Sequence, residues 1–279
     1  MQEIVVKSFC KINIGLNIIS KREDGYHNLQ TIFYPISLAD KITFRKSKEL
    51  KFFSNSDLLN SEKNNLIIKA IELLENYTGE LFNVEIFLEK NIPIGAGLGG
   101  GSSNAAFTLK AINELFELKI SMEKLKELAL TLGSDVPLFL SDLPAYAESR
   151  GEKLKKINLK VKHPILIINP GIHISTKWAF SKISPKKSEI NLEEVIEKYP
   201  TNYKVWQELI NNDFEQIVIE EFNEIKDLQN LLSEFGADFY KMSGSGSTFF
   251  AIFSDNENLY SAKKYFEEKN YFTYIEYPN

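Results

Sequence analysis

Residues 93–103 read Pro93-Ile-Gly-Ala-Gly-Leu-Gly-Gly-Gly-Ser-Ser103, and glycine fills five of the eleven positions. Ordering a glycine costs more conformational entropy than ordering any other residue, so a plain turn seldom contains five so close together. Because side chains are absent, backbone N–H groups can close around a polyanion, and the helix expected to follow adds the positive end of its dipole. This loop therefore predicts a phosphate-binding site.

Regular elements flank the loop on both sides. Apolar residues alternate with others over 83–89, which is the pattern of a half-buried strand. After the loop, apolar residues recur at helix spacing from about Ser102 to Phe116. Ser121 is typical of a helix N-cap, and the helix that it begins is expected to end near Gly133. The expected order is strand, glycine loop, helix, helix.

Three known phosphate-binding loops can be compared with this one. Gly95, Gly97 and Gly100 match the G-x-G-x-x-G pattern of dinucleotide-binding enzymes, but that fingerprint needs a second strand with an acidic end about 20 residues later. A P-loop needs Lys after its last glycine, and a protein kinase needs His-Arg-Asp and Asp-Phe-Gly; the chain has neither. A phosphate cradle whose cation comes from elsewhere is favoured. A dinucleotide-dependent oxidoreductase and a non-catalytic nucleotide-binding regulator stay open as minor alternatives.

Lys11 is the candidate for that cation. Apolar side chains alternate with polar ones at Ile12, Ile14, Leu16 and Ile18. This alternation predicts a strand with Lys11 and Asn13 on the face opposite the apolar set. Phosphoryl transfer needs positive charge at the terminal phosphate and a group that orients or deprotonates the attacking hydroxyl. Lys11 fits the first task.

Asp135 and a second glycine-rich stretch are the other candidates. Asp135 follows Leu132-Gly-Ser and precedes an apolar, strand-like run, so it is either a turn former or a carboxylate presented to substrate. Residues 242–250 read Met-Ser-Gly-Ser-Gly-Ser-Thr-Phe-Phe, which sets small residues directly before a buried strand. The three histidines have no metal-ligand spacing and no G-x-S-x-G occurs, so a zinc site and a serine hydrolase are not expected.

The rest of the chain predicts an α+β protein in two domains. Strands are expected at 41–45, 165–169 and 247–253, and helices over about 66–77, 191–234 and 257–269, with a polar loop over 54–65. Strands and helices without a regular βαβ rhythm indicate the α+β class. A lysine-rich stretch at 150–163 marks a boundary between domains of residues 1–158 and 159–279.

Composition narrows the class of protein. The chain of 279 residues is 43% hydrophobic and 25% charged, as in ordinary globular proteins. Its one cysteine, Cys10, excludes a disulfide framework. No apolar run approaches the ~20 residues that span a bilayer, and residues 2–4 do not resemble the start of a signal peptide. The net charge of −5 argues against a nucleic-acid partner. We expect a cytoplasmic protein that acts on a small molecule, as a monomer or a dimer.

Taken together, these motifs resemble the galactokinase–homoserine kinase–mevalonate kinase–phosphomevalonate kinase (GHMP kinase) superfamily. Residues 93–106 resemble its ATP loop, and residues 243–248 resemble its C-terminal glycine motif. A more specific resemblance, to the family that phosphorylates 4-diphosphocytidyl-2-C-methyl-D-erythritol, rests on further stretches. They are Lys11-Ile-Asn-Ile-Gly-Leu-Asn17, Arg22-Glu-Asp-Gly-Tyr-His-Asn-Leu-Gln-Thr31, Asn65-Leu-Ile-Ile68, Leu132-Gly-Ser-Asp-Val-Pro137, and Pro170-Gly171 with Ser175-Thr176 and Phe180.

The resemblance implies an N-terminal domain like ribosomal protein S5 domain 2, a ferredoxin-like C-terminal domain and an active site between them. It also implies that ATP, with Mg²⁺, phosphorylates the 2-hydroxyl of this substrate in non-mevalonate isoprenoid synthesis. Asp135 would be the general base and Lys11 its partner, steadying the developing charge. A homoserine-type or mevalonate-type kinase stays an alternative, which Tyr26-His27 disfavours because those substrates carry no base to stack.

The resemblance also implies the remaining site residues. ATP would be bound by Pro93, Ile94, Gly95, Ala96, Gly97, Leu98, Gly99, Gly100, Gly101, Ser102, Ser103 and Asn65. The cytidine-bearing substrate would be bound by Asn13, Tyr26, His27, Thr176 and Phe180. Stacking on an aromatic ring contributes ~1–3 kcal/mol per base, and a histidine offers hydrogen bonds to the base edge. The sequence contains no pair of carboxylates that can be recognised as Mg²⁺ ligands, so no metal-binding residues are predicted.

Overall fold

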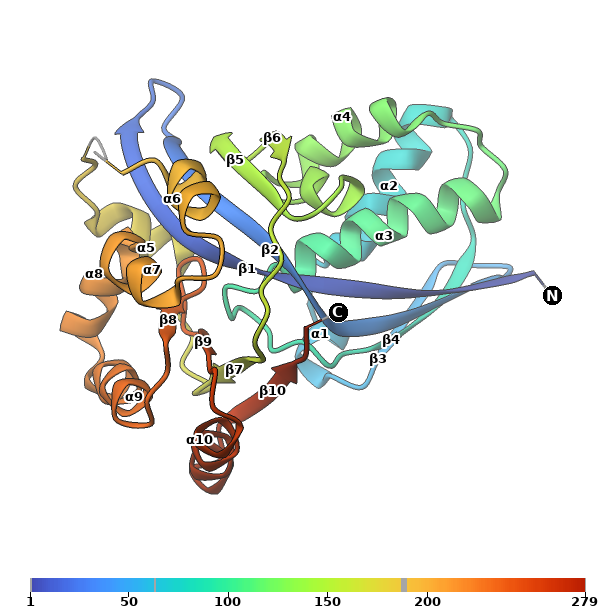
Figure 1. Cartoon of the computed structure of the whole chain (residues 1–279). Helices are drawn as coiled ribbons and strands as arrows, with labels where there is room; N and C mark the ends of the chain where they lie inside the picture. Colours follow the sequence, from blue (N-terminus) through green and yellow to red (C-terminus); the bar gives the residue numbers. More distant parts are fainter. Residues whose placement is uncertain (1, 63, 187–189, 279) are drawn as a thin grey trace. The chain divides into compact units, whose positions relative to one another are not determined.

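The computed structural model describes residues 2–62, 64–186 and 190–278, and its chain divides into two compact units (Figure 1). Unit 1 comprises Met1–Cys10, Ser37–Ile94 and Gly99–Asp142; unit 2 comprises Lys11–Ile36, Gly95–Leu98 and Leu143–Asn279. The units interleave along the chain because two long strands, β1 (Glu3–Lys21) and β2 (His27–Lys46), each contribute to both. The linear boundary at residues 158 and 159 stays a prediction.

Unit 1 combines a small sheet with three packed helices. In the sheet, β3 (Lys51–Ser54) pairs in parallel with β4 (Val84–Glu89), and β4 pairs antiparallel with the end of β2, from Lys41↔Glu89 to Lys46↔Val84. Alternate residues of β4 are buried, as the sequence pattern predicts. The helices α2 (Leu66–Thr78), α3 (Gly100–Leu115) and α4 (Met122–Leu132) pack on one another (Figure 1).

Local chemistry fixes where the helices of unit 1 begin. Ser121 Oγ accepts a hydrogen bond from Lys124 N at 3.3 Å, which confirms the predicted N-cap of α4. Helix α3 begins at Gly100, two residues earlier than predicted, directly after Gly99 with φ 70°. Glycine has a poor helix propensity, so the sequence pattern does not reveal that Gly100 and Gly101 belong to the helix.

Two short predictions for unit 1 are wrong. The expected polar loop over 54–65 contains the one-turn helix α1 (Asp57–Asn60), with an acidic residue at its start that favours a helix N-terminus. The apolar run after Asp135 is no strand but a buried 3₁₀ helix, η1 (Pro137–Leu140). Proline at its first position has the φ that a helix start requires and lacks the N–H that a strand ladder would use.

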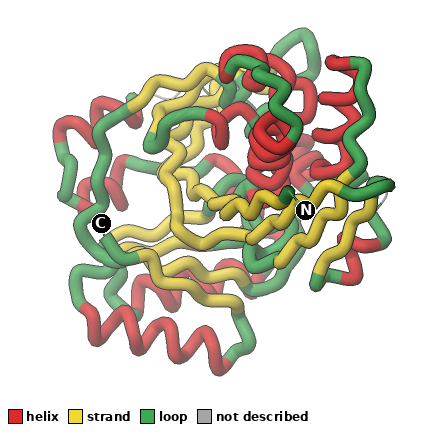
Figure 2. The backbone as a smooth tube through the Cα atoms, turned by 90° about the vertical axis from the view of Figure 1, so that its right-hand side faces the viewer, coloured by secondary structure: helices red, strands yellow, loops and turns green. Residues whose placement is uncertain are grey.

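Unit 2 contains a four-stranded antiparallel sheet in the order β10-β7-β9-β8. The strands are β7 (Ile165–Asn169), β8 (Phe239–Met242), β9 (Phe249–Ile252) and β10 (Phe272–Glu276). Along the chain, helices come between β7 and β8, and α10 (Asn256–Glu268) comes between β9 and β10. Figure 2 shows the helices of the chain in red and its strands in yellow. This βαββαβ arrangement confirms the predicted ferredoxin-like fold. The first half of β2 pairs elsewhere, with β5 (Ala145–Ser149), which pairs with β6 (Lys153–Lys156).

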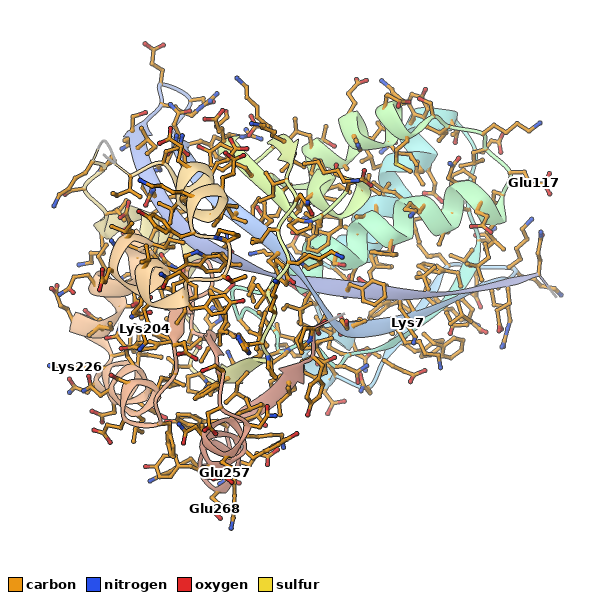
Figure 3. All side chains as sticks on the ribbon, viewed as in Figure 1. Lys7, Glu117, Lys204, Lys226, Glu257 and Glu268 are labelled. Atoms are coloured by element: carbon orange, nitrogen blue, oxygen red, sulfur yellow. The ribbon has the colours of Figure 1, made fainter. Side chains whose placement is uncertain are left out.

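The core of unit 2 combines its sheet, its helices and part of β1. The intervening helices are α5 (Thr176–Lys182), α6 (Leu192–Lys198), α7 (Tyr203–Leu209), α8 (Asp213–Glu221) and α9 (Asn223–Glu234). Leu16 and Ile18 of β1 belong to the same buried cluster as Leu166, Phe214 and Phe249. Some of the charged side chains of this unit are exposed, among them Lys204, Lys226, Glu257 and Glu268, which Figure 3 labels. Within the described residues, no helix has the length and apolarity needed to cross a membrane.

Candidate functional site

The first part of the glycine loop, residues 95–98, is held in unit 2 by β1 and by the second glycine-rich stretch. Lys11 Nζ donates to Gly97 O at 2.9 Å and to Asn13 Oδ1 at 2.6 Å, and Lys11 N donates to Leu98 O at 3.1 Å. Ser243 Oγ donates to the same Gly97 oxygen at 3.0 Å and accepts from Asn13 N at 3.2 Å. Three predicted segments therefore meet at one carbonyl group, that of Gly97.

Close approach at this point requires glycine. Gly97 has φ +77°, and a Cβ built on it would lie 2.1 Å from Ser243 O, a backbone atom that cannot swing away. Gly95 has φ +65°, and a Cβ there would lie 2.8 Å from His173 Nδ1. Both positions need the left-handed conformation that glycine adopts without strain.

Lys11 and Asn13 are buried, each only 3% exposed. The Lys11 ammonium lies 5.5 Å from the ring centre of Phe33, in addition to its contacts with carbonyl and amide oxygens. Asn13 Nδ2 donates to Thr31 Oγ1 at 2.9 Å. A buried charge is tolerated where hydrogen-bond partners compensate for the water it has lost. The oxygens of Asn13 and Gly97 do this for the Lys11 ammonium and hold it in place.

The second glycine-rich stretch, residues 242–248, is fixed by two asparagines that the sequence analysis did not single out. Asn212 Nδ2 donates to Met242 O at 2.7 Å and to Gly244 O at 2.8 Å, and Asn169 Nδ2 donates to Thr248 Oγ1 at 2.9 Å. Thr176 Oγ1 lies 2.9 Å from Ser245 Oγ, so this predicted substrate residue contacts the same glycine-rich stretch that Asn13 contacts at Ser243. For Asn169, the available signal was an asparagine at the end of a strongly apolar strand.

The residues predicted to hold a base make two separate ring contacts in unit 2. His27 and Phe180 stack, with ring centres 5.0 Å apart and planes at 22°. Burial, helped by the charge of Lys21, lowers the pKa of His27 and favours the neutral imidazole, which has one donor and one acceptor. Tyr26 is 52% exposed and lies over Arg150, whose Cζ is 4.2 Å from the ring centre. The structure therefore pairs His27 with Phe180, and Tyr26 with a residue that the sequence analysis missed.

Unit 1 contains the rest of the loop and the start of α3. The N–H groups in the first turn of a helix lack intrahelical acceptors and form the positive end of the helix dipole. They therefore suit an anion. Ser103 differs from its neighbours, because Ser103 N donates to Gly99 O at 2.9 Å and Ser103 Oγ donates to Phe9 O at 2.5 Å. Ser8 Oγ also donates to Ser103 Oγ, at 2.7 Å. The ATP-binding role of Ser103 stays a prediction.

Asn65 has an unsatisfied donor. Its Oδ1 accepts from Ile67 N at 2.9 Å and caps α2, while its Nδ2 is buried and has no hydrogen-bond partner among the described residues. The residue is 7% exposed. A buried donor without an acceptor is costly, so this amide is suited to a ligand that brings one.

Asp135 lies half-buried in unit 1, in the turn between α4 and η1. The turn is closed by the hydrogen bond from Val136 N to Gly133 O at 3.2 Å, and Val136 is fully buried. Asp135 belongs to unit 1 and Lys11 to unit 2. The convergence of the two side chains stays a prediction.

Two points concern other chemistries. Helix α3 is followed by helix α4, not by a strand with an acidic end, so the dinucleotide-binding interpretation of Gly95, Gly97 and Gly100 is wrong. Among the described residues, no three His, Cys, Asp or Glu side chains are grouped as metal ligands.

Comparisons with known proteins agree with this geometry. The family model described as GHMP kinases N terminal domain matches residues 65–142, and GHMP kinases C terminal matches residues 192–271. A protein of Thermodesulfovibrio yellowstonii named 4-diphosphocytidyl-2-C-methyl-D-erythritol kinase is 37% identical over 95% of this chain and 94% of that protein. A protein of Persephonella marina with the same name is 40% identical over 89% of this chain and 90% of that protein.

Solved structures give the same result. The crystal structure of a 4-(cytidine 5′-diphospho)-2C-methyl-D-erythritol kinase matches with a TM-score of 0.81 and 30% identity, over 98% of both chains. A homoserine kinase from Cytophaga hutchinsonii shares the fold, with a TM-score of 0.71 at 17% identity over 100% of this chain and 96% of that one. The chain therefore belongs to the GHMP kinases, a superfamily of small-molecule kinases that use ATP, and within it to the 4-diphosphocytidyl-2-C-methyl-D-erythritol kinase family.

Proposed function

We propose that this chain transfers the γ-phosphoryl group of ATP to the 2-hydroxyl of 4-diphosphocytidyl-2-C-methyl-D-erythritol, giving the 2-phosphate and ADP. This reaction belongs to the non-mevalonate synthesis of isoprenoids. The observation that supports it best is the buried Lys11 ammonium, which is bound to the backbone of the phosphate loop at Gly97 O. A positive charge fixed at such a loop is what phosphoryl transfer requires.

Asp135 is the general base in this proposal. The substrate hydroxyl gives its proton to the Asp135 carboxylate as its oxygen bonds to the γ-phosphorus, and the bond from that phosphorus to the β,γ-bridging oxygen breaks to release ADP. Lys11 stabilises the charge that develops on the transferred group. Asn13 and Thr176 orient the substrate, since Asn13 bonds to Ser243 and Thr176 to Ser245 of the same glycine-rich stretch.

The glycine loop and Asn65 would bind ATP. Backbone N–H groups at the start of α3 suit the phosphates, and Asn65 Nδ2, a buried donor without a partner, suits an acceptor on the adenine. Mg²⁺ normally accompanies ATP, where it keeps several waters and phosphate oxygens as ligands. The described residues form no cage for it.

His27, Phe180 and Tyr26 would bind the cytosine. A neutral imidazole can donate to and accept from the base edge, and the exposed ring of Tyr26 offers a face for stacking. Binding between His27 and Phe180 would first separate their stacked rings. This group is the part of the proposal that distinguishes the cytidine substrate from homoserine or mevalonate.

A coupled assay tests the reaction. ATP consumption should depend on the cytidine-bearing substrate and should not occur with homoserine or mevalonate. Turnover of either of those two at a comparable rate, or none with the cytidine compound, would overturn the proposed substrate.

Asp135→Asn tests the base. General-base catalysis contributes about 10²–10⁴-fold, so kcat should fall by that factor while ATP binding is nearly unchanged. Asp57→Asn, at an exposed aspartate of the same unit, is the matched control and should leave kcat unchanged. Normal turnover by Asp135→Asn would show that another group accepts the proton.

A further inference from the structure

A buried ion pair that the proposed mechanism does not use lies where the chain leaves β4 and enters the phosphate loop. Lys90 Nζ is 2.7 Å from Asp40 Oδ2, and the two side chains are 8% and 0% exposed. Burying an ion pair costs desolvation energy that its own attraction often fails to recover, so such a pair is weak evidence for a role in stability. Burial also lowers the pKa of Lys90, against the opposing effect of Asp40. A contribution to stability therefore does not explain why this ion pair is buried.

The pair holds the residues that precede the loop. Asp40 Oδ1 accepts hydrogen bonds from Asn91 N and Ile92 N, both at 2.8 Å. Lys90 Nζ donates to Ile92 O at 2.5 Å as well as to Asp40. Three consecutive residues, 90–92, are thereby fixed directly before Pro93. Every one of these contacts lies within unit 1.

The same ammonium lies behind the first residue of α3. A Cβ built on Gly100 would be 3.3 Å from Lys90 Nζ and 3.1 Å from Ile92 Cγ2, so glycine at this position lets the helix start come close to the lysine. The positive member of the pair therefore lies next to the N-terminus of α3. A helix N-terminus attracts anions through its dipole, and a cation beside it adds to that attraction.

We propose that Lys90 and Asp40 are positioning residues for bound ATP: the pair fixes the entry to the phosphate loop and adds positive potential at the start of α3. The inference rests on the proposed function, in which this loop binds the phosphates of ATP. Lys90 acts from behind the loop, through the backbone of residues 92 and 100. Asp40 holds the ammonium there.

The double variant Lys90→Met with Asp40→Asn tests the proposal. It removes both charges, leaves no lone buried charge, and keeps an acceptor oxygen at residue 40 for the two backbone N–H groups. A partly buried charge near a helix end contributes enough to change affinity about 5- to 30-fold. We expect KM for ATP, and Kd for ADP measured by calorimetry, to rise by that factor. KM for the cytidine substrate should change less than about twofold.

Lys41→Met is the matched control. Lys41 forms an ion pair of the same length, 2.7 Å to Glu89, between β2 and β4, but both side chains are exposed. Its removal should leave both KM values unchanged. A second variant, Gly100→Ala, places a methyl group against the ammonium at a helical position where alanine is the better helix former. It should raise KM for ATP in the wild-type background, and by a smaller factor in the double variant.

The outcomes separate this inference from the proposed function. Wild type that neither binds ADP nor consumes ATP would overturn the function itself. Wild type that does both, with a double variant that melts normally and binds ADP within twofold of wild type, would overturn the role of the pair. If the double variant fails to fold, the single variant Lys90→Met, provided that it folds, replaces it as the background for Gly100→Ala. If Gly100→Ala then raises KM for ATP by the same factor in Lys90→Met as in wild type, the pair serves the fold alone.

Discussion

Gly97 has the tightest surroundings among the glycines described, and its replacement is the sharpest test at the scale of one residue. Gly97→Ala adds strain at φ +77° and a Cβ 2.1 Å from Ser243 O, so the loop must move away from Ser243 and Lys11. The strain costs about 1–2 kcal/mol and the overlap about 1–3 kcal/mol more. We expect a loss of stability of that size in urea unfolding, with kcat lowered because the Lys11 contact shifts.

Gly79 provides the control for this prediction. It has nearly the same backbone conformation, φ +75°, but a Cβ there meets nothing within 4 Å. Gly79→Ala should therefore lose only the stability that backbone strain costs, about 1–2 kcal/mol, and should keep full activity. Equal losses in the two variants would mean that the contact between Gly97 and Ser243 is dispensable.

Single residues show where sequence reasoning ends. Lys11 and Gly97 could be found because alternation and glycine clustering are local patterns. The pair of Lys90 and Asp40 could not be found in this way, because the two residues are 50 positions apart and the sequence around each gives no sign of a partner. The roles of Ser103 and Asn65 depend on which of their atoms already have partners, and only coordinates supply that.

At the scale of elements, helix α8 supports the second glycine-rich stretch through a buried carboxylate. Glu215 Oε2 accepts from Met242 N at 2.8 Å, and Oε1 accepts from Gln229 Nε2 at 2.5 Å. Burial raises the pKa of Glu215 in the folded protein, while Lys241 and these two donors oppose the rise. The folded state therefore holds a proton at pH values where the unfolded chain has released it.

The sign of the resulting pH dependence follows from this raised pKa. The contribution of protonated Glu215 is fully present below the unfolded-state pKa and is lost as the pH rises through the folded-state pKa. Glu215→Gln stays neutral, so the melting temperature of wild type should fall relative to that of the variant between pH 4 and pH 8. Thermal melts at several pH values check this. A difference that does not change with pH would contradict the prediction.

Elements were predictable where a periodic pattern was long, and were not where glycine or proline interrupts it. Strand β4 and the cap of α4 agree with the sequence pattern. The start of α3 was placed two residues late because glycines hide a helix, and η1 was expected to be a strand because a short apolar run fits either structure. Strand β1 is far longer than the alternating stretch around Lys11 suggested.

At the scale of the whole molecule, the two-unit organisation was predictable but the way the chain forms the units was not. The sequence analysis divided the chain once, at residues 158 and 159. In the structure, residues 11–36 belong with residues 143–279. Such a grouping depends on contacts between residues more than 100 positions apart, and no local pattern records them.

The core of unit 2 leads to a prediction about the fragment 159–279. Leu16 and Ile18 of β1 are part of its buried cluster, Ile18 N donates to Asp213 Oδ2 at 2.6 Å, and Leu16 N donates to Asn211 O at 2.8 Å. Losing one buried leucine or isoleucine side chain costs about 2–5 kcal/mol, and a whole domain is stable by only about 5–15 kcal/mol. The isolated fragment should therefore show no cooperative thermal transition by circular dichroism.

Adding back the missing strand distinguishes this explanation from general instability of the fragment. A co-expressed fragment 1–158 should restore a cooperative transition, because it supplies both side chains and both backbone donors of β1. The same fragment with Leu16→Ala and Ile18→Ala should restore it at a lower temperature, since its backbone donors remain while the buried aliphatic groups are missing. If fragment 159–279 alone melts cooperatively near the temperature of the full chain, β1 does not contribute to that core, and the linear division at residue 158 describes the folding units after all.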